Sequence, residues 1–301
     1  MDIIDNLRYK WRYGSMLIKL VFVNIAVFII LNIATLILSI SGQPAQLALG
    51  LVEMPSQLSA LAVRPWTVFT YMFSQYDFLH LLFNMVWLYW FGSIFLLADS
   101  SKNMCALYIY GGLGGAALFI AGYAAMDTYG LLIGSSASVL AIVTATAIRQ
   151  PDYKVGLLFL GEISLKWLAI ITIAIDLLSM GGNNGGGHMA HIGGAITGAI
   201  YAIAQRKGVN IAAPFNSMTD SVVNLWKRMT APRQPKANSR QSGGTSYRTG
   251  TASGASEKAK TSSKADETSL DEILDKVKKS GYGALSAEEK KRLFDISRRI
   301  K

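Results

Sequence analysis

Residues 78–98 read FLHLLFNMVWLYWFGSIFLLA, and this stretch decides the fold class of the chain. Its 21 residues include no Asp, Glu, Lys or Arg. A membrane-spanning helix needs roughly 20 predominantly apolar residues, because it must cross a hydrocarbon core about 30 Å thick at about 1.5 Å per residue. The stretch therefore predicts a transmembrane helix, and this helix would carry two unusual polar side chains, His80 and Asn84.

Five other apolar stretches of the sequence have the same character. They cover residues 20–40, 103–126, 128–148, 166–180 and 189–205. We therefore expect an all-α, polytopic membrane protein in which six transmembrane helices form a bundle over residues 17–205. The first apolar run is too long for the core of a signal peptide and is not followed by a small-residue cleavage site, so we expect it to be a retained helix.

The composition excludes several protein classes. Hydrophobic residues make up 51% of the chain and charged residues 16%, whereas soluble domains carry about 25% charged residues. This deficit argues against a soluble enzyme and against a wholly disordered chain. The single cysteine, Cys105, allows no intrachain disulfide, and no Cys/His spacing indicates a metal site.

The net charge of +10 belongs to one part of the chain. Residues 1–205 hold nine basic and nine acidic side chains, so the remaining 20 basic and 10 acidic side chains lie in residues 206–301. This basic tail lacks the interleaved aromatic residues typical of nucleic-acid binding. We therefore expect a solvated segment with no nucleic-acid partner, although attraction to anionic lipids is plausible.

Basic residues in short loops predict the orientation, because they favour the cytoplasmic side. With six crossings, eight of the nine basic residues in residues 1–205 fall on one side, and Arg64 is the exception. Both termini are then cytoplasmic, and the expected location is a cell membrane of the bacterial inner type. The predicted segments are a cytoplasmic N-terminus (1–16), the membrane domain (17–205), a largely disordered linker (206–268) and a cytoplasmic helical hairpin (269–301).

The hairpin prediction depends on two S-x-x-E patterns, Ser269 with Glu272 and Ser286 with Glu289. This spacing is typical of a capping box at a helix N-terminus. Such a hairpin could bind a cytoplasmic partner.

Four polar residues inside the predicted spans require an explanation, because polar groups are costly there. They are His80, Asn84, Ser136 and His191. Each one alone is better explained by helix packing or by an interhelical hydrogen bond. Together they supply a nucleophile, a base and two hydrogen-bond donors at i and i+4, all in the outer half of the membrane.

Glycines next to His191 indicate how two of these residues could meet. Gly194 and Gly198 form a GxxxG pattern, which lets a neighbouring helix backbone approach closely. If that neighbour is the helix that carries Ser136, the hydroxyl and the imidazole can form a Ser–His dyad. Asp176 is the one acidic residue that could join them, although it more plausibly pairs near the end of its own span.

Three motifs in this order resemble the rhomboid family of intramembrane serine proteases. They are HLLFN at residues 80–84, GSSA at residues 134–137 and AHIGGAITG at residues 190–198. The resemblance covers about residues 15–205. It implies that Ser136 is the nucleophile, that His191 is the general base, and that His80, Asn84 and the Ser136 amide form the oxyanion hole. It also implies single-span membrane substrates, a lipid bilayer as solvent and no cofactor.

The chain departs from the family pattern at four positions: Gln75, Thr67, Ala137 and Leu140, where many members have histidine, arginine, glycine and an aromatic residue. The glycine-rich loop 181–187 could act as a lid. Two alternatives remain open. One is a non-catalytic rhomboid-like protein that binds transmembrane helices. The other is a small-solute transporter, which the absence of an internal repeat disfavours.

Overall fold

A computed structural model of the chain describes residues 3–157, 161–179 and 185–230, together with residues 273, 277, 285, 286, 289 and 290. The chain divides into two compact units, Met1–Pro232 and Arg233–Lys301, each treated by itself below.

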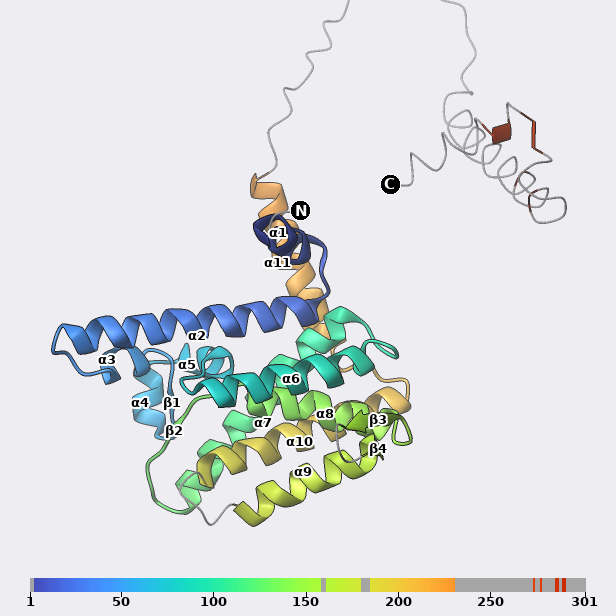
Figure 1. The fold of residues 1–301 in the computed structure, drawn as a ribbon. Helices are drawn as coiled ribbons and strands as arrows, with labels where there is room; N and C mark the ends of the chain where they lie inside the picture. Colours follow the sequence, from blue (N-terminus) through green and yellow to red (C-terminus); the bar gives the residue numbers. More distant parts are fainter. Residues whose placement is uncertain are drawn as a thin grey trace, which may run out of the picture. The chain divides into compact units, whose positions relative to one another are not determined.

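The first unit is a bundle of helices, drawn in Figure 1. Six of its helices form the bundle: α2 (Met16–Ile40), α6 (Phe78–Phe95), α7 (Ser101–Ala125), α8 (Ser136–Arg149), α9 (Leu165–Ser179) and α10 (Gly185–Arg206). Helix α2 lies along one side of the bundle and α9 along the opposite side. Helix α8 is the centre, because every residue from Ala137 to Ala147 is buried.

The bundle confirms a mostly helical membrane protein. Three helices of the described chain, α2, α6 and α7, are long and apolar enough to cross a membrane. Helix α8 and the first part of α9 are apolar but shorter. The count of six crossings therefore stays a prediction.

The predicted helix over 128–148 is wrong at its start, because α8 begins at Ser136. The residues from 128 to 135 do not belong to a helix, and among them β2 (Leu131–Leu132) pairs antiparallel with β1 (Met54–Pro55). Gly134 has a φ of 135°, outside the helical range, and this ends any helix that approaches from the N-terminal side. Helix α8 is therefore 14 residues long, or about 21 Å at about 1.5 Å per residue.

The expected loop over 181–187 is also partly wrong. Residues 185–187 already belong to α10, which begins four residues before the predicted 189. The loop prediction over 181–184 lies outside the described residues, as do the side chain of Asp176 and its expected pairing.

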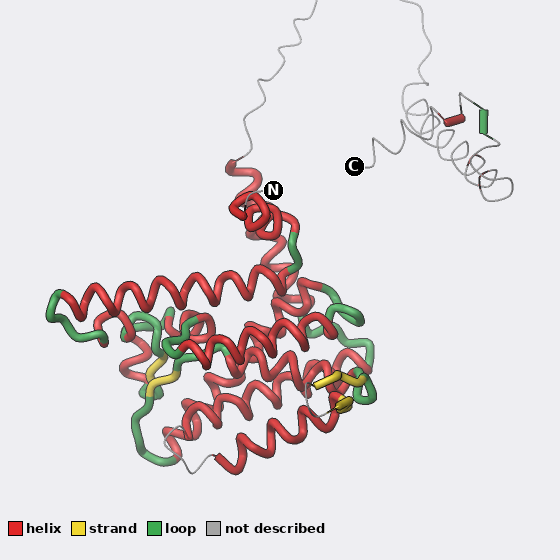
Figure 2. The backbone as a smooth tube through the Cα atoms, in the orientation of Figure 1, coloured by secondary structure: helices red, strands yellow, loops and turns green. Residues whose placement is uncertain are grey.

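Shorter elements connect and flank the bundle. They are α1 (Ile3–Tyr13), α3 (Gln46–Leu49), α4 (Leu58–Val63), α5 (Thr67–Thr70), the 3-10 helix η1 (Tyr71–Phe73), β3 (Lys154–Leu157), β4 (Gly161–Ser164) and α11 (Ala213–Thr230). The two strand pairs lie at opposite ends of the bundle, as Figure 2 shows. The predicted linker 206–268 is thus helical at its start, where α11 lies.

Hydrogen bonds from three side chains to backbone carbonyls stabilise the segment between α2 and α6. Arg64 Nη1 donates to Gly50 O at 2.7 Å, and Trp66 Nε1 donates to Leu51 O at 2.9 Å. The Thr67 hydroxyl, which stands where many rhomboid proteins have arginine, donates to Arg64 O at 2.7 Å. These bonds anchor the segment without the family arginine.

In the second unit, the capping box at Ser286 is confirmed. The Ser286 N–H donates to Glu289 Oε2 at 2.7 Å, and the Glu289 N–H donates to Ser286 Oγ at 3.3 Å. The side chains of Ile273 and Leu285 are buried. The first predicted box, at Ser269 and Glu272, lies outside the described residues.

Candidate active site

Ser136 and His191 are in direct contact. Ser136 is the first residue of α8, and His191 lies in the second turn of α10. His191 Nε2 and Ser136 Oγ are 2.6 Å apart, which is hydrogen-bond distance. When the imidazole carries its proton on Nδ1, the serine hydroxyl donates to Nε2, which is the arrangement that activates a serine nucleophile.

The glycine face of α10 explains this proximity. A Cβ at Gly194 would lie 2.1 Å from Ala137 O, and a Cβ at Gly198 would lie 2.2 Å from Ala141 O. Real side chains do not approach a carbonyl oxygen so closely, so the backbones of α8 and α10 touch because these two positions lack side chains.

Replacing Gly194 by Ala should therefore separate α8 from α10. We expect the unfolding free energy to fall by about 1–3 kcal/mol, as for other overpacked sites. Any reaction of the Ser136 hydroxyl that needs His191 should slow by about a hundredfold, the scale of loss from a misplacement of about 1 Å. Reversible unfolding in mixed micelles measures the first effect, and the rate at which a serine-directed probe labels Ser136 measures the second.

Gly156→Ala is the matched control for this change, because nothing lies within 4 Å of the position that its Cβ would take. If Gly194→Ala behaved like Gly156→Ala, the close contact between α8 and α10 would not be what holds Ser136 against His191.

His80 lies on the other side of Ser136. It occupies the first turn of α6, where its N–H donates to the N-cap residue Asp77 at 2.7 Å. A Cβ on Gly134 would lie 3.0 Å from His80 Cε1 and 3.6 Å from Ser136 Oγ. The Gly134 N–H donates to Tyr71 O at 3.0 Å, which holds this positive-φ glycine between the two side chains.

One cavity of about 200 Å³ joins all four predicted site residues. Its walls come from α6, α8, α9 and α10, and the lining residues are His80, Phe83, Asn84, Trp87, Ser136, Val139, Leu140, Val143, Thr172 and His191. Thr172 and Trp87 were not singled out from the sequence, because a threonine or a tryptophan in a span is ordinary.

Asn84 is engaged in a buried network. Its Nδ2 donates to Gln75 Oε1 and to His80 O, each at 3.0 Å. Gln75 Nε2 in turn donates to Asn24 Oδ1 at 3.1 Å, and Asn24 Nδ2 donates to Tyr108 OH at 3.1 Å. Gln75, where many family members have histidine, therefore links Asn84 to α2, and Asn84 must give up one bond to donate elsewhere.

The other two departures from the family pattern are also accommodated. The methyl group of Ala137 faces Gly115, where an added Cβ would lie 2.6 Å away, so the missing side chain on α7 leaves room for it. Leu140 is buried in the cavity wall beside the dyad. The His188 ring lies edge-on to the His191 ring, with centroids 5.8 Å apart.

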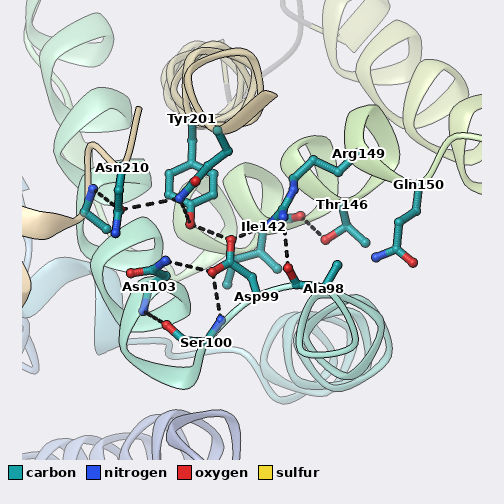
Figure 3. A network of polar contacts seen from close by, with 12 residues as sticks. Ala98, Asp99, Ser100, Asn103, Ile142, Thr146, Arg149, Gln150, Tyr201 and Asn210 are labelled. Atoms are coloured by element: carbon teal, nitrogen blue, oxygen red, sulfur yellow. Dashed lines mark hydrogen bonds and ion pairs between the residues drawn. The ribbon is translucent and has the colours of Figure 1, made fainter. Parts of the chain in front are cut away.

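A second polar cluster lies at the other ends of the same helices, around Asp99 (Figure 3). Asp99 pairs with Arg149 at the end of α8 and accepts a hydrogen bond from Tyr201 of α10 at 2.8 Å. Asn103 of α7 donates to the same carboxylate at 2.7 Å. The side chains of Asp99 and Arg149 are 7% and 20% exposed. The cluster thus joins α7, α8 and α10. Ser136 and His191 lie at the opposite ends of α8 and α10.

Two protein-family models match this chain. One, described as a rhomboid domain, matches residues 62–207, and the other, described as a family of unknown function, matches residues 257–299. The second match overlaps the predicted hairpin.

Two curated proteins are similar to the chain. Presenilin-associated rhomboid-like protein A, mitochondrial, from Danio rerio is 30% identical over 135 residues, which are 43% of this chain and 34% of the relative. RHOMBOID-like protein 12, mitochondrial, from Arabidopsis thaliana is 30% identical over 159 residues, which are 47% of each chain. The chain thus spans less than half the length of either relative.

Proposed function

Because residues 62–207 of this chain form a rhomboid domain, we propose that the protein is an intramembrane serine endopeptidase. The observation that carries the proposal is the 2.6 Å contact between Ser136 Oγ and His191 Nε2 in a cavity that His80 and Asn84 also line. A helix-packing serine would not need a base at hydrogen-bond distance inside a cavity.

In the proposed reaction, Ser136 Oγ attacks the scissile carbonyl carbon while His191 Nε2 takes the hydroxyl proton. The tetrahedral intermediate collapses, the C–N bond breaks, and His191 gives the proton to the leaving nitrogen. Water then hydrolyses the acyl-enzyme, with His191 again acting as base.

Three donors are proposed for the oxyanion. The Ser136 N–H is in the first turn of α8, where backbone N–H groups have no intrahelical partner. His80 reaches the same place from α6, and Asn84 supplies its amide after it releases the bond to Gln75 or to the His80 carbonyl. Such fixed donors stabilise the charge that develops in the transition state.

The proposed substrates are single-span membrane proteins, cut near the outer face of the membrane. We place the domain in a cell membrane as a six-span bundle with both ends cytoplasmic, on the basis of the basic loop residues. A bacterial inner membrane is the proposed site, whereas both relatives are mitochondrial by name.

A fluorophosphonate probe tests the proposal directly, because it reacts only with an activated serine. The purified chain in detergent should be labelled at Ser136, and His191→Ala should reduce labelling at least about a hundredfold, since a general base contributes about 10²–10⁴ in rate. Peptide mapping of the labelled protein gives the site.

Ser138→Ala is the matched control, because Ser138 lies two residues further along α8 and its buried hydroxyl has no hydrogen-bond partner in the described structure. This variant should label normally. A folded wild-type chain that resists the probe would favour the alternative function, a non-catalytic protein that binds transmembrane helices.

A further inference from the structure

A second and larger cavity forms a groove between α8, α9 and α10, and its residues from α8 lie nearer the C-terminal end of that helix than those of the first cavity. Its volume is about 620 Å³, within the range of about 300–1,000 Å³ typical of ligand sites. Its walls are mainly alanine and isoleucine, among them Ala169, Ile173, Ala195 and Ala199. The site residues described above do not line it.

The groove is open to its surroundings along one edge. Ile170 of α9 and Ile196 of α10 line it and are 53% and 50% exposed. In a domain whose helices lie in a bilayer, exposed isoleucines face lipid chains. An apolar chain can therefore enter the groove sideways from the bilayer.

Two cations close one end of the groove. Lys166 is near the start of α9, and Arg206 is the last residue of α10. Both lie at helix ends, where the bilayer core gives way to headgroups. The groove thus combines an apolar trough with positive charge at headgroup depth.

Both cations have capacity for an anionic ligand. Lys166 Nζ lies 2.7 Å from Asp152 Oδ1. The side chains of Lys166 and Asp152 are 46% and 81% exposed, so this ion pair is weak and an anionic ligand can replace it. Arg206 Nη2 donates to the Ile148 carbonyl, and none of the carboxylates that the structure describes forms an ion pair with it. A guanidinium has five N–H donors, so most remain for a ligand.

We propose that this groove binds one acidic glycerophospholipid. The headgroup phosphate binds Lys166 and Arg206, and one acyl chain lies between α9 and α10. Basic pockets between transmembrane helices are a known setting for acidic lipid headgroups. The end of the groove away from the two cations reaches Ile192, the residue next to His191, so the lipid would support the helix that carries the proposed base.

Native mass spectrometry of the purified full chain tests the proposal. The protein in detergent is titrated with phosphatidylglycerol and, separately, with phosphatidylcholine of the same acyl chains. We expect one phosphatidylglycerol to bind at least about tenfold more tightly than phosphatidylcholine. Replacing both cations, in Lys166→Gln with Arg206→Gln, should weaken binding about thirtyfold, because each cation near a headgroup contributes about fivefold.

Matched controls distinguish lipid binding in the groove from lipid binding elsewhere on the surface of the protein. Lys154→Gln removes an exposed cation of the neighbouring β3, which is outside the groove, and should leave binding unchanged. Ala199→Leu fills the groove and should abolish the tight adduct, whereas Ala174→Leu adds the same bulk to an exposed position of α9 that does not line it. Should the double charge variant fail to fold, Arg206→Gln and Ala199→Leu decide the outcome.

Three results would overturn the proposal: equal binding of the two lipids, an unchanged affinity in Ala199→Leu, or equal losses in Lys154→Gln and Arg206→Gln. Displacement of the adduct by a transmembrane peptide, one for one, would instead assign the groove to a protein segment and would also contradict it. The readout is lipid binding, so it does not depend on the proposed protease activity.

Discussion

Replacing either Ser136 or His191 by alanine is expected to lower cleavage of a single-span substrate in liposomes by at least about a thousandfold. The serine supplies the attacking atom, and the histidine moves the proton in both halves of the proposed reaction. Loss of either member of such a pair in serine proteases removes most of the catalysis, because the two act as one unit. Single-turnover cleavage rates in reconstituted vesicles measure the loss.

The double variant distinguishes catalysis from a general effect on the fold. If Ser136 and His191 act as one unit, the double variant is no slower than either single variant. Ser138→Ala, on the same helix, should keep full activity. The dyad assignment fails if His191→Ala retains more than about a tenth of the wild-type rate while its unfolding transition is unchanged.

The second large effect is on stability. Asp99→Ala should lower the unfolding free energy by about 3–5 kcal/mol, the usual result of removing one member of a buried ion pair. The change leaves the Arg149 guanidinium without its carboxylate in a site where it is 20% exposed. It also removes the acceptor for Tyr201 and Asn103. Reversible unfolding in mixed micelles measures the difference.

An exposed ion pair of the same bundle is the control. Lys102 Nζ and Asp220 Oδ1 are 2.6 Å apart, but the two side chains are 59% and 50% exposed. Water screens such a pair, so Asp220→Ala should change the unfolding free energy by less than about 1 kcal/mol. Equal losses in the two variants would mean that burial of Asp99 does not set the strength of its network.

The sequence was sufficient to predict where the bundle helices lie. Charge-free stretches near 20 residues located α2, α6 and α7 to within four residues, because length and hydropathy are properties of each segment alone. The same reasoning located α9 and α10, but it placed the start of α8 eight residues too early. Residues 128–135 are apolar enough for a helix, but Leu131 and Leu132 pair with β1, which is a long-range contact, and Gly134 has a φ of 135°, so α8 begins only after them.

The candidate site was predictable for a different reason. Ser136, His191, His80 and Asn84 are polar groups in an apolar background, so each one is conspicuous in the sequence. The residues that surround and support them are not predictable in this way. Gln75, which bonds to Asn84, Thr172, which lines the cavity, and the Asp99 network are ordinary residues in ordinary segments, and their roles depend on contacts between helices that no local pattern encodes.

The short length of α8 has a consequence for the biosynthesis of the protein. A helix of 14 residues preceded by extended backbone lacks the apolar length to remain stably in a bilayer by itself. Extended backbone exposed to lipid would also leave N–H and C=O groups unpaired. Helix α8 therefore requires enclosure by its neighbours, and the glycine face that packs against it belongs to α10, which the ribosome makes later. A nascent chain consequently carries Ser136 without an assembled site until α10 has been made and inserted.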